Sequence, residues 1–327
     1  MTVRIAIIGA GHMGRIHAQN LSRDERVQLV AIEDIVAGNA EKAAIEYSCA
    51  ACASLDDIFA HKPDAVYVTT PNALHLEPVM AALQRGIHVF SEKPMATDLG
   101  EAKQILDAVE STGLTYQIGF NRRFAPVYKF ARERIAQGFI PFSANVKMNR
   151  GELLNPPWVG NTALTGGFLY ESAIHLLDMI RWLMGEVVEV VCRAEANVYK
   201  ELDDFSAILT FESGHHAVFS SCAHSSWAFP FEKIELYGEH ASIVTEEMEK
   251  VTFSPALKEQ IITSDCFQLT PSEKWGYVEE DRLFVDALVG EGFPPVKALD
   301  GYRAVELVEA LYRSAKSGRP VRLPLEI

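Results

Sequence analysis

The first third of the chain alternates between short apolar runs and helical patterns. Residues 3–8 are apolar at nearly every position, which is typical of a parallel strand buried on both faces. Similar apolar runs follow at residues 27–32, 65–69, 87–90 and 115–119. Amphipathic patterns between them predict helices at residues 13–21, 38–47, 55–59, 74–85 and 99–111. Strands that alternate with helices predict an α/β fold with a doubly wound parallel sheet.

After Arg123 the pattern changes from this regular alternation to clustered strands. Helical patterns occupy residues 124–137, 168–184, 278–289 and 301–317. Strand-like runs occupy residues 143–150, 187–198, 205–212, 216–222 and 231–237, with further strands expected within 242–253 and 261–269. We therefore predict two domains, residues 1–122 and residues 123–327, the second an α+β domain with a large, open, mostly antiparallel sheet and helices on one face.

Composition narrows the class of protein. The 327 residues carry a net charge of −14 and are 48% hydrophobic, which predicts a globular protein with a large core. An acidic balance argues against nucleic acid and against an anionic membrane surface as partners. We expect no signal peptide and no membrane span, because no apolar run is long enough.

The five cysteines are scattered, which favours reduced thiols in a cytoplasmic protein. Cys49 and Cys52 form a C-x-x-C motif, for which a redox or zinc pair is the alternative. No second pair accompanies it, so we favour two small buried residues. No group of residues has metal-ligand spacing, and we expect no metal.

A glycine-rich turn follows the first strand. Gly9, Gly11 and Gly14 have the spacing G-x-G-x-x-G, enclose His12 and Met13, and lie between a strand and a helix. This order is typical of a dinucleotide fingerprint. Gly9 would allow the tight turn, Gly11 the approach of a pyrophosphate, and Gly14 close packing of the helix, whose N-terminus would face the phosphates.

The second strand ends at an acidic residue. Asp34 lies 20 residues after Gly14, near the position where a carboxylate receives the ribose hydroxyls of the cofactor. The alternative is a surface acid at the start of a loop. A carboxylate there would repel a 2′-phosphate, which favours NAD over NADP; Arg15 is the one nearby cation that would weaken this preference.

Polar side chains also follow the later strands, at the edge where open α/β sheets bind ligands. Cofactor contacts are predicted for Thr70, Pro71, Asn72, His75, Glu92, Lys93 and Asn121. Arg123 is assigned to the substrate side.

The ordered motifs resemble the glucose–fructose oxidoreductase, inositol dehydrogenase and MocA-like family of NAD(P)-dependent oxidoreductases. The resemblance rests on GAGHMG, Asp34, TTPN with His75, EKP at residues 92–94, and GGFLYESAIHLLD at residues 166–178. It implies a Rossmann domain, a second domain with an open sheet, hydride transfer at a hydroxyl of a sugar, cyclitol or similar polyol, and homodimers or homotetramers formed through the outer face of that sheet.

By motif position, the resemblance makes Lys93 and His175 the catalytic pair. Glu171 stands where inositol dehydrogenases usually carry an aspartate, which puts inositol itself in doubt as the substrate. The family also implies a cis peptide bond before Pro94.

The chemistry of these side chains fits those roles. Alcohol oxidation needs a base for the hydroxyl proton, and histidine suits neutral pH. Glu171 and His175 are four residues apart and would share a helical face, so Glu171 is assigned with Lys93 and His175 to catalysis and substrate binding. Asp178 would orient His175 or stabilise the helix locally. Lys93 would hold the substrate oxygen and favour neutral His175.

Each of these residues also has an ordinary structural interpretation. A histidine on an apolar helix is usually part of the core, and a lysine is usually a surface charge. Trp158 and Tyr170 would form an apolar wall against a sugar face or simply pack. Asn155, in the same loop region as Trp158, is assigned to substrate binding.

We predict an NAD-dependent dehydrogenase acting on CH–OH groups. The alternatives are a ketone or imine reductase in sugar biosynthesis and a catalytically silent NAD-binding regulator.

Overall fold

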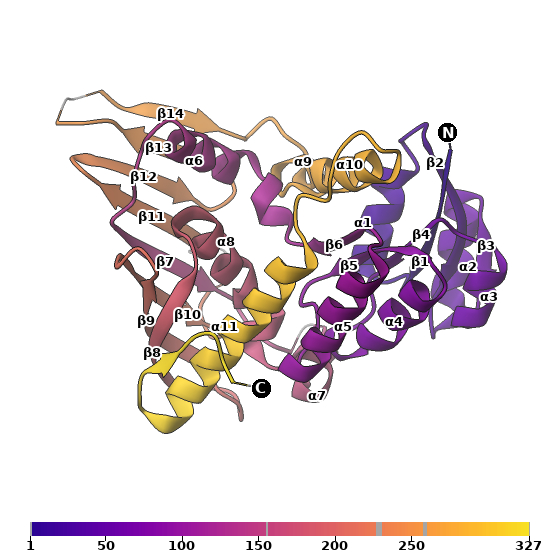
Figure 1. The fold of residues 1–327 in the computed structure, drawn as a ribbon, viewed down its shortest axis with the longest axis horizontal. Helices are drawn as coiled ribbons and strands as arrows, with labels where there is room; N and C mark the ends of the chain where they lie inside the picture. The colour runs from indigo at the N-terminus through magenta and orange to yellow at the C-terminus, as the bar shows by residue number, and fades with distance from the viewer. Residues whose placement is uncertain (1, 155, 227–230, 258–259, 327) are drawn as a thin grey trace. The chain divides into compact units, whose positions relative to one another are not determined.

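The protein was analysed as a computed structural model that describes residues 2–154, 156–226, 231–257 and 260–326. The chain forms two compact units. Unit 1 comprises Met1–Phe120 and Tyr277–Arg303, and unit 2 comprises Asn121–Gly276 and Ala304–Ile327. Figure 1 shows the elements of each unit along the chain.

Unit 1 contains a six-stranded, all-parallel sheet with the order β3-β2-β1-β4-β5-β6. Its strands are β1 (Val3–Ile8), β2 (Val27–Glu33), β3 (Ala50–Cys52), β4 (Ala65–Val68), β5 (His88–Glu92) and β6 (Tyr116–Gly119). The chain reverses its direction of progress across the sheet at β1, which pairs with β2 on one side and β4 on the other. The predicted doubly wound sheet is confirmed.

Helices surround this sheet in unit 1. They are α1 (His12–Leu21), α2 (Ala37–Tyr47), α3 (Leu55–Ala60), α4 (Leu76–Gln84), α5 (Leu99–Thr112), α10 (Tyr277–Leu288) and the start of α11 (Ala298–Ser317). A core cluster joins strand side chains such as Ile5 and Tyr67 to Phe284 and Val285 of α10. Burial of this apolar surface holds α10 in unit 1.

The division into two continuous domains needs one correction. The predicted boundary at residues 122 and 123 lies close to the observed change at residues 120 and 121, but residues 277–303 return to unit 1. The physical reason is that α10 packs against α1 and the core, and its Asp281 bonds to His17 of α1.

Unit 2 is built on a nine-stranded mixed sheet with the order β14-β13-β12-β11-β7-β10-β9-β8-β15. Its strands are β7 (Ser143–Asn149), β8 (Val187–Glu195), β9 (Asp204–Phe211), β10 (His216–Cys222), β11 (Glu232–Gly238), β12 (Ala241–Glu246), β13 (Lys250–Ser254), β14 (Ile262–Asp265) and β15 (Val321–Arg322). Among the described residues, β7 and β10 pair in parallel and the other neighbouring strands of this sheet pair antiparallel, so the mostly antiparallel sheet is confirmed.

The sheet of unit 2 has one buried and one exposed face. Along β9 and β10, Phe205, Leu209 and Phe219 are fully buried, whereas the alternate residues Ile208 and Val218 are exposed. The helical elements are α6 (Pro126–Ala136), α7 (Thr162–Thr165), α8 (Ile174–Met184), α9 (Pro271–Lys274), the end of α11, the 3₁₀ turns η2 (Asn121–Phe124) and η3 (Pro157–Gly160), and the π-helical turn η4 (Leu169–Ala173).

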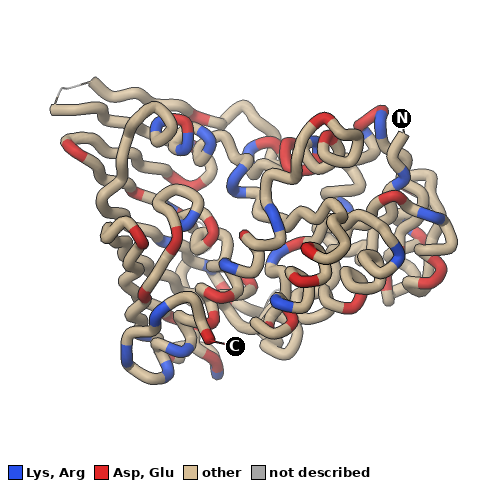
Figure 2. The backbone as a smooth tube through the Cα atoms, viewed as in Figure 1, with Lys and Arg blue, Asp and Glu red and all other residues tan. Residues whose placement is uncertain are grey.

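Charged residues of both signs are interspersed along both units (Figure 2). Among the described residues, no helix combines the length and the apolar character that crossing a membrane requires. Cys49 and Cys52 lie at the junction of α2 and β3, and burial raises the pKa of the Cys49 thiol to about 11. A thiol with a raised pKa is a poor nucleophile and a poor metal ligand at neutral pH.

Candidate active site

The glycine turn joins β1 to α1 in unit 1. Gly9 has a φ of +100°, and a Cβ there would lie 2.7 Å from the carbonyl oxygen of Thr69. A Cβ on Gly14 would lie 2.0 Å from the carbonyl oxygen of Gly9. A Cβ on Gly11 would meet none of the described atoms within 4 Å. Two glycines are therefore required by packing, while the third borders open space.

The N-terminus of α1 is suited to an anion. Gly11 is its N-cap, with no side-chain hydrogen bond to the cap and no acidic residue in the first turn. The helix therefore presents backbone N–H groups and the positive end of its dipole beside the open space at Gly11. His12 and Met13 form its first two positions.

Asp34 follows β2 and is fixed against this turn. Its carboxylate accepts the Ala10 N–H at 2.9 Å and the Val36 N–H at 2.8 Å, and it also accepts the Asn39 side-chain amide at 3.3 Å. These bonds set the direction of the carboxylate before any ligand binds.

Arg15 is paired in a way that bears on cofactor choice. Its Nη2 lies 2.5 Å from Glu46 Oε2, and both side chains are exposed. Arg15, which would favour a 2′-phosphate, is thus already paired with a carboxylate.

Beyond β4, residues 69–75 run along the same sheet edge. The Thr69 hydroxyl donates to the Gly9 carbonyl at 2.6 Å, which ties this segment to the glycine turn. Thr70 and Pro71 are partly exposed, and Asn72 is buried. The ring nitrogens of His75 lie 2.7 Å from the Pro94 carbonyl and 2.9 Å from the Thr70 carbonyl, and burial lowers the His75 pKa. Through these contacts His75 joins the loop after β4 to the loop after β5. Its contact with the cofactor stays a prediction.

Beyond β5 stand Glu92 and Lys93. Glu92 is buried, and its Oε2 accepts the backbone N–H of Lys93 at 3.0 Å. Lys93 is partly buried, and its peptide bond to Pro94 is cis, as the family resemblance implied. The structure therefore brings the glycine turn, Asp34, residues 69–75 and Lys93 to one edge of the parallel sheet.

In unit 2, Glu171 and His175 lie on consecutive helical segments. Glu171 belongs to η4 and His175 to the first turn of α8. Gly167, with a φ of +105°, allows the Tyr312 hydroxyl to approach and accept the Leu169 N–H at 3.2 Å. This bond holds the start of η4. Their spacing of four residues keeps Glu171 and His175 on one side of the helical segment.

Arg150, which sequence reasoning did not select, lies beside Glu171. Its Nη1 is 3.6 Å from Glu171 Oε1 and donates to the Ser172 hydroxyl at 3.1 Å, and its Nε donates to the Glu152 carbonyl at 3.0 Å. The sequence signal for it was its position as the last residue of the predicted strand 143–150, before a loop with glycine and prolines.

Arg123 and Asp178 form a buried pair. The guanidinium donates from Nε and Nη2 to the two carboxylate oxygens at 2.8 and 2.6 Å, and Arg181 approaches the same carboxylate at 3.6 Å. Asp178 thus binds Arg123 of η2, which anchors α8 to η2, and Arg181 one turn along α8 itself. This geometry favours a structural role for Arg123; its predicted substrate contact remains untested.

Asn121 has a comparable structural engagement. Its side-chain amide donates to the Trp275 carbonyl at 2.8 Å, and its oxygen accepts from Arg122 at 3.2 Å. It belongs to unit 2, whereas the other predicted cofactor residues belong to unit 1. Its cofactor contact stays a prediction.

The residues predicted to form an apolar wall differ in burial. Tyr170 is buried and stacks on Tyr312 with ring centroids 6.1 Å apart, which favours the packing interpretation. Trp158 in η3 is partly exposed. Asn155 lies outside the described residues.

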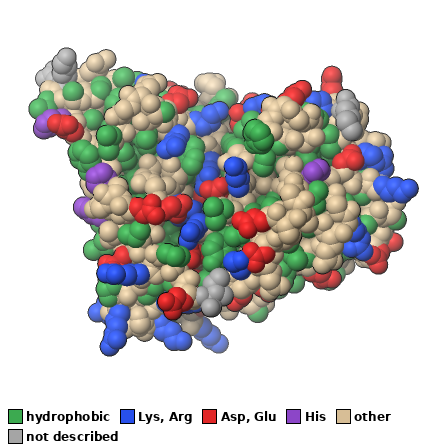
Figure 3. All heavy atoms as spheres, in the orientation of Figure 1, with side chains coloured by type: hydrophobic (Ala, Val, Ile, Leu, Met, Phe, Trp, Pro, Cys, Tyr) green, Lys and Arg blue, Asp and Glu red, His purple; other side chains and the backbone are tan. Residues whose placement is uncertain are grey.

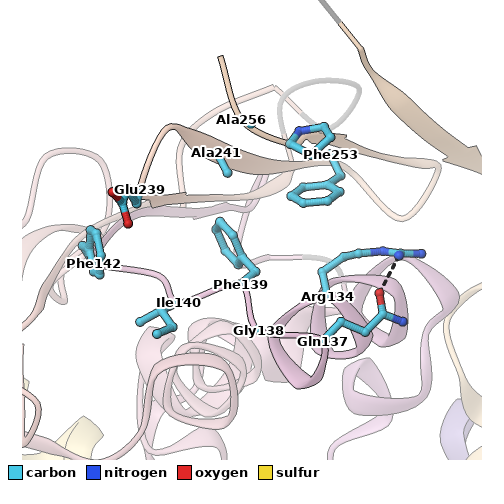
Figure 4. A pocket seen from close by; sticks show the side chains of 11 residues that line it. Arg134, Gln137, Gly138, Phe139, Ile140, Phe142, Glu239, Ala241, Phe253 and Ala256 are labelled. Carbon is cyan, nitrogen blue, oxygen red and sulfur yellow. Dashed lines mark hydrogen bonds between the residues drawn. The ribbon is translucent and has the colours of Figure 1, made fainter. Parts of the chain in front are cut away.

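A groove elsewhere in unit 2 contains none of the predicted site residues. It is lined by the end of α6, residues 137–142 and the strands β12 and β13. Figure 4 shows Phe139 and Phe253 in it, with Arg134 bonded to Gln137 at 2.7 Å. Hydrophobic side chains are frequent on the face of the molecule drawn in Figure 3. Among the described residues, no group of three or more His, Cys, Asp or Glu side chains is placed to hold a metal.

Comparison with known proteins decides the family. Residues 3–120 match the model described as "Oxidoreductase family, NAD-binding Rossmann fold", and residues 132–323 match its partner, "Oxidoreductase family, C-terminal alpha/beta domain". The chain belongs to the Gfo/Idh/MocA oxidoreductase family. Unit 1 therefore contains an NAD(P)-binding Rossmann domain.

Known proteins are similar to this chain over nearly its whole length. An uncharacterized oxidoreductase, YrbE, of Bacillus subtilis is 30% identical over 97% of this chain and 95% of its own. An inositol 2-dehydrogenase of Rhizobium meliloti is 28% identical over 99% and 100%. The solved levoglucosan dehydrogenase in complex with NADH is 20% identical, with a TM-score of 0.92 and full coverage of both chains, which shows the shared fold.

Proposed function

We propose that this member of the Gfo/Idh/MocA family transfers a hydride between NAD and a CH–OH group of a sugar, cyclitol or related polyol. The observation that carries the proposal is the Asp34 carboxylate, fixed by the Ala10 N–H beside the open Gly11 turn. A prepared carboxylate next to an uncapped helix N-terminus fits a dinucleotide ribose and pyrophosphate.

The residues of unit 1 fit NAD in several respects. The turn from Gly9 to Gly14 would receive the pyrophosphate, and Asp34 would accept the ribose hydroxyls. Ile35 is 95% exposed, so its apolar side chain is available to cover the adenine. NAD is favoured over NADP because Asp34 repels a 2′-phosphate and Arg15 pairs with Glu46. NAD bound there would supply the acceptor or donor of the hydride for the substrate carbon.

The chain's own residues would manage the substrate oxygen and its proton. An imidazole nitrogen of His175 would take the hydroxyl proton during oxidation and return it during reduction. The ammonium of Lys93 would bind the same oxygen and stabilise its developing negative charge. The Glu171 carboxylate would accept hydrogen bonds from neighbouring hydroxyls, with Arg150 holding it in place.

These acceptors and the relatives support the proposed substrate class. A carboxylate beside the proposed base suits a substrate with adjacent hydroxyls, and the Rhizobium meliloti relative is an inositol 2-dehydrogenase. The glutamate at position 171, where inositol dehydrogenases usually carry aspartate, favours a polyol other than inositol.

A turnover screen tests the proposal. The purified protein is mixed with NAD or NADP and with cyclitols, free sugars or nucleotide sugars, and absorbance at 340 nm is followed in both directions. Turnover of at least one polyol with NAD is expected. NADH binding without any turnover would instead indicate a silent regulator, and turnover only of ketones or imines would indicate a biosynthetic reductase.

We further propose that the protein is a homodimer or homotetramer. The exposed face of the sheet in unit 2 carries Val191, Ile208 and Val218 on three neighbouring strands. A second copy would cover this apolar row.

A further inference from the structure

A network of hydrogen-bonded, buried polar side chains joins α10, α1 and β5 in unit 1. His17 of α1 is fully buried; its Nδ1 lies 2.7 Å from Asp281 Oδ1 of α10, and its Nε2 lies 3.1 Å from Glu92 Oε1 of β5. Asn20, one turn along α1, donates to the other oxygen of Asp281 at 2.8 Å. Both carboxylates are almost completely buried.

The geometry sets the protonation state of His17. Each ring nitrogen faces a carboxylate oxygen, and an ionised carboxylate only accepts hydrogen bonds. A neutral imidazole would leave one nitrogen lone pair against a carboxylate, so the imidazolium satisfies both contacts. Burial lowers the His17 pKa, but Asp281 and Glu92 outweigh it and raise the His17 pKa well above its usual value. Burial raises the Glu92 pKa, but His17 and Lys93 lower it overall.

Aromatic rings form much of the remaining environment of the imidazolium. The rings of Tyr67, Phe90 and Tyr277 surround it at centroid distances of 5.2, 5.0 and 6.1 Å. Burial, with Asp281, keeps the pKa of Tyr67 well above its usual value, so this phenol stays neutral. The carboxylates that bond to His17 are Asp281 of α10 and Glu92 of β5, so the imidazolium joins these two elements.

The second carboxylate oxygen of Glu92, Oε2, connects this network to Lys93 of the proposed site. It accepts the Lys93 backbone N–H at 3.0 Å. Gly119, paired with Glu92 on the adjacent strand, leaves room for the carboxylate, because a Cβ there would lie 3.2 Å from Glu92 Oε2. Glu92 is therefore held on one side by His17 and holds Lys93 on the other.

We propose that His17 and Glu92 are positioning residues that fix the backbone of Lys93, and with it the direction of the Lys93 ammonium. The part of this inference that concerns catalysis rests on the proposed function of Lys93. The hydrogen-bonded connection from His17 through Glu92 to the Lys93 amide, called the link below, lies within unit 1 and is testable without substrate. It predicts that loss of the positive charge on His17 weakens the hydrogen bond of the Lys93 amide to Glu92 and speeds hydrogen exchange at this amide.

Hydrogen–deuterium exchange tests the link directly. Exchange at the Lys93 amide is measured on overlapping peptides by mass spectrometry in the unmodified protein, His17→Gln and Glu92→Gln. Pro94 has no amide, which helps to isolate Lys93. Exchange at Lys93 should accelerate by about tenfold or more in both variants, as expected when one hydrogen bond is weakened. The Ala10 amide, bonded to Asp34, is the internal control and should change little.

The outcomes separate a positioning role from a merely structural one. Accelerated exchange throughout unit 1, including Ala10, would indicate general loosening and overturn the proposal. Unchanged exchange at Lys93 in a folded His17→Gln or Glu92→Gln protein would also overturn it. If His17→Gln fails to fold, Glu92→Gln decides the question.

Kinetics then connect the link to catalysis. With an active polyol, His17→Gln should lower kcat by about tenfold while the Kd for NADH stays within about twofold, because the bonds to Asp34 and the glycine turn are retained. His216→Gln, which changes an exposed histidine of β10, is the matched control. If the unmodified protein has no turnover, the proposed function fails, while the exchange result still stands for the link. Normal kcat in His17→Gln would refute the catalytic part.

Discussion

At the scale of single residues, the hydrogen bonds of the Asp34 carboxylate give the most direct information about the ligand. Its carboxylate bonds to backbone N–H groups on both sides, from Ala10 in the glycine turn and from Val36 beyond the strand. A surface acid at the start of a loop would explain the second bond, but not the first. The bond to Ala10 ties the carboxylate to the turn that would receive the pyrophosphate.

Asp34→Ser should narrow the preference for NAD over NADP. The loss of charge-assisted hydrogen bonds to the ribose costs about 1.5–3 kcal/mol, roughly a tenfold or larger fall in NAD affinity. Affinity for NADP should rise, because the repulsion of its 2′-phosphate is removed. Calorimetric titration of both dinucleotides measures the two changes, with Glu41→Gln, at an exposed acid of α2, as control. A preference of the unmodified protein for NADP would show that this interpretation of Asp34 is wrong.

His17 predicts a pH dependence of stability. Its folded-state pKa lies above its usual value of 6.5, so the folded protein binds this proton more tightly than the unfolded chain does. The resulting stabilisation is fully present below about pH 6.5 and is lost as the pH rises through the folded-state value. Urea unfolding of the unmodified protein and His17→Gln should therefore give a stability difference that shrinks from pH 6 to pH 9. A constant difference would contradict an imidazolium at this position.

At the scale of elements, the glycine turn separates two physical roles within one motif. Gly14 is a packing residue, since its missing Cβ lets α1 approach the Gly9 carbonyl in the turn after β1. Gly11 borders open space and has a φ of −69°, which any residue adopts. Fold stability and ligand binding should therefore respond differently to changes at these two positions.

Gly11→Ala and Gly14→Ala form a matched pair that tests this separation. Gly14→Ala should destabilise the protein by about 1–3 kcal/mol or prevent folding, because the methyl group overlaps the Gly9 carbonyl. Gly11→Ala should change stability by no more than about 0.5 kcal/mol, yet lower NADH affinity by roughly tenfold because the methyl group enters the space of the pyrophosphate. Thermal unfolding and NADH fluorescence titration measure the two effects. Equal NADH affinity in Gly11→Ala would place the phosphates elsewhere.

Most elements were predictable because apolar periodicity and helix caps are local signals. The helix from Leu55, for example, begins after Ser54, whose hydroxyl caps the Asp57 N–H as expected. The stretch 242–253 did not show its turn, because the chain reverses after Glu247, which adopts a φ of +53° without a glycine or asparagine. The predicted helix 168–184 begins as the π-helical turn η4, a change of hydrogen bonding that an apolar pattern does not reveal.

At the scale of the whole molecule, the sequence indicated both sheets but not the return of α10 to unit 1. His17 and Asp281 are 264 positions apart, and neither belongs to a motif that signals their pairing. Of the candidate site, the glycine turn, Asp34, Lys93, Glu171 and His175 came from motifs. Arg150 and His17 did not, because their importance lies in contacts with distant residues.

The oligomer should depend on the exposed face of the sheet in unit 2. Val191, Ile208 and Val218 are 41%, 51% and 45% exposed and pair directly across β8, β9 and β10. Light scattering should give at least twice the chain mass of 36.2 kDa at micromolar concentration. Ile208→Lys should shift the protein toward monomer by placing a charge in the covered row, whereas Val198→Lys, in the loop after β8, should not. A monomeric unmodified protein would refute the proposed assembly.

The central claim, hydride transfer assisted by His175 and Lys93, is tested most directly by steady-state kinetics of His175→Ala, Lys93→Ala and the double variant with an active polyol. NADH binding is measured separately, and His216→Gln is the control. We predict that His175→Ala lowers kcat by roughly 10²–10⁴, the usual contribution of a positioned proton acceptor, with little change in NADH affinity. The loss in the double variant should be far smaller than the product of the single losses, because both groups act on one proton transfer. Near-normal turnover by His175→Ala would contradict the account.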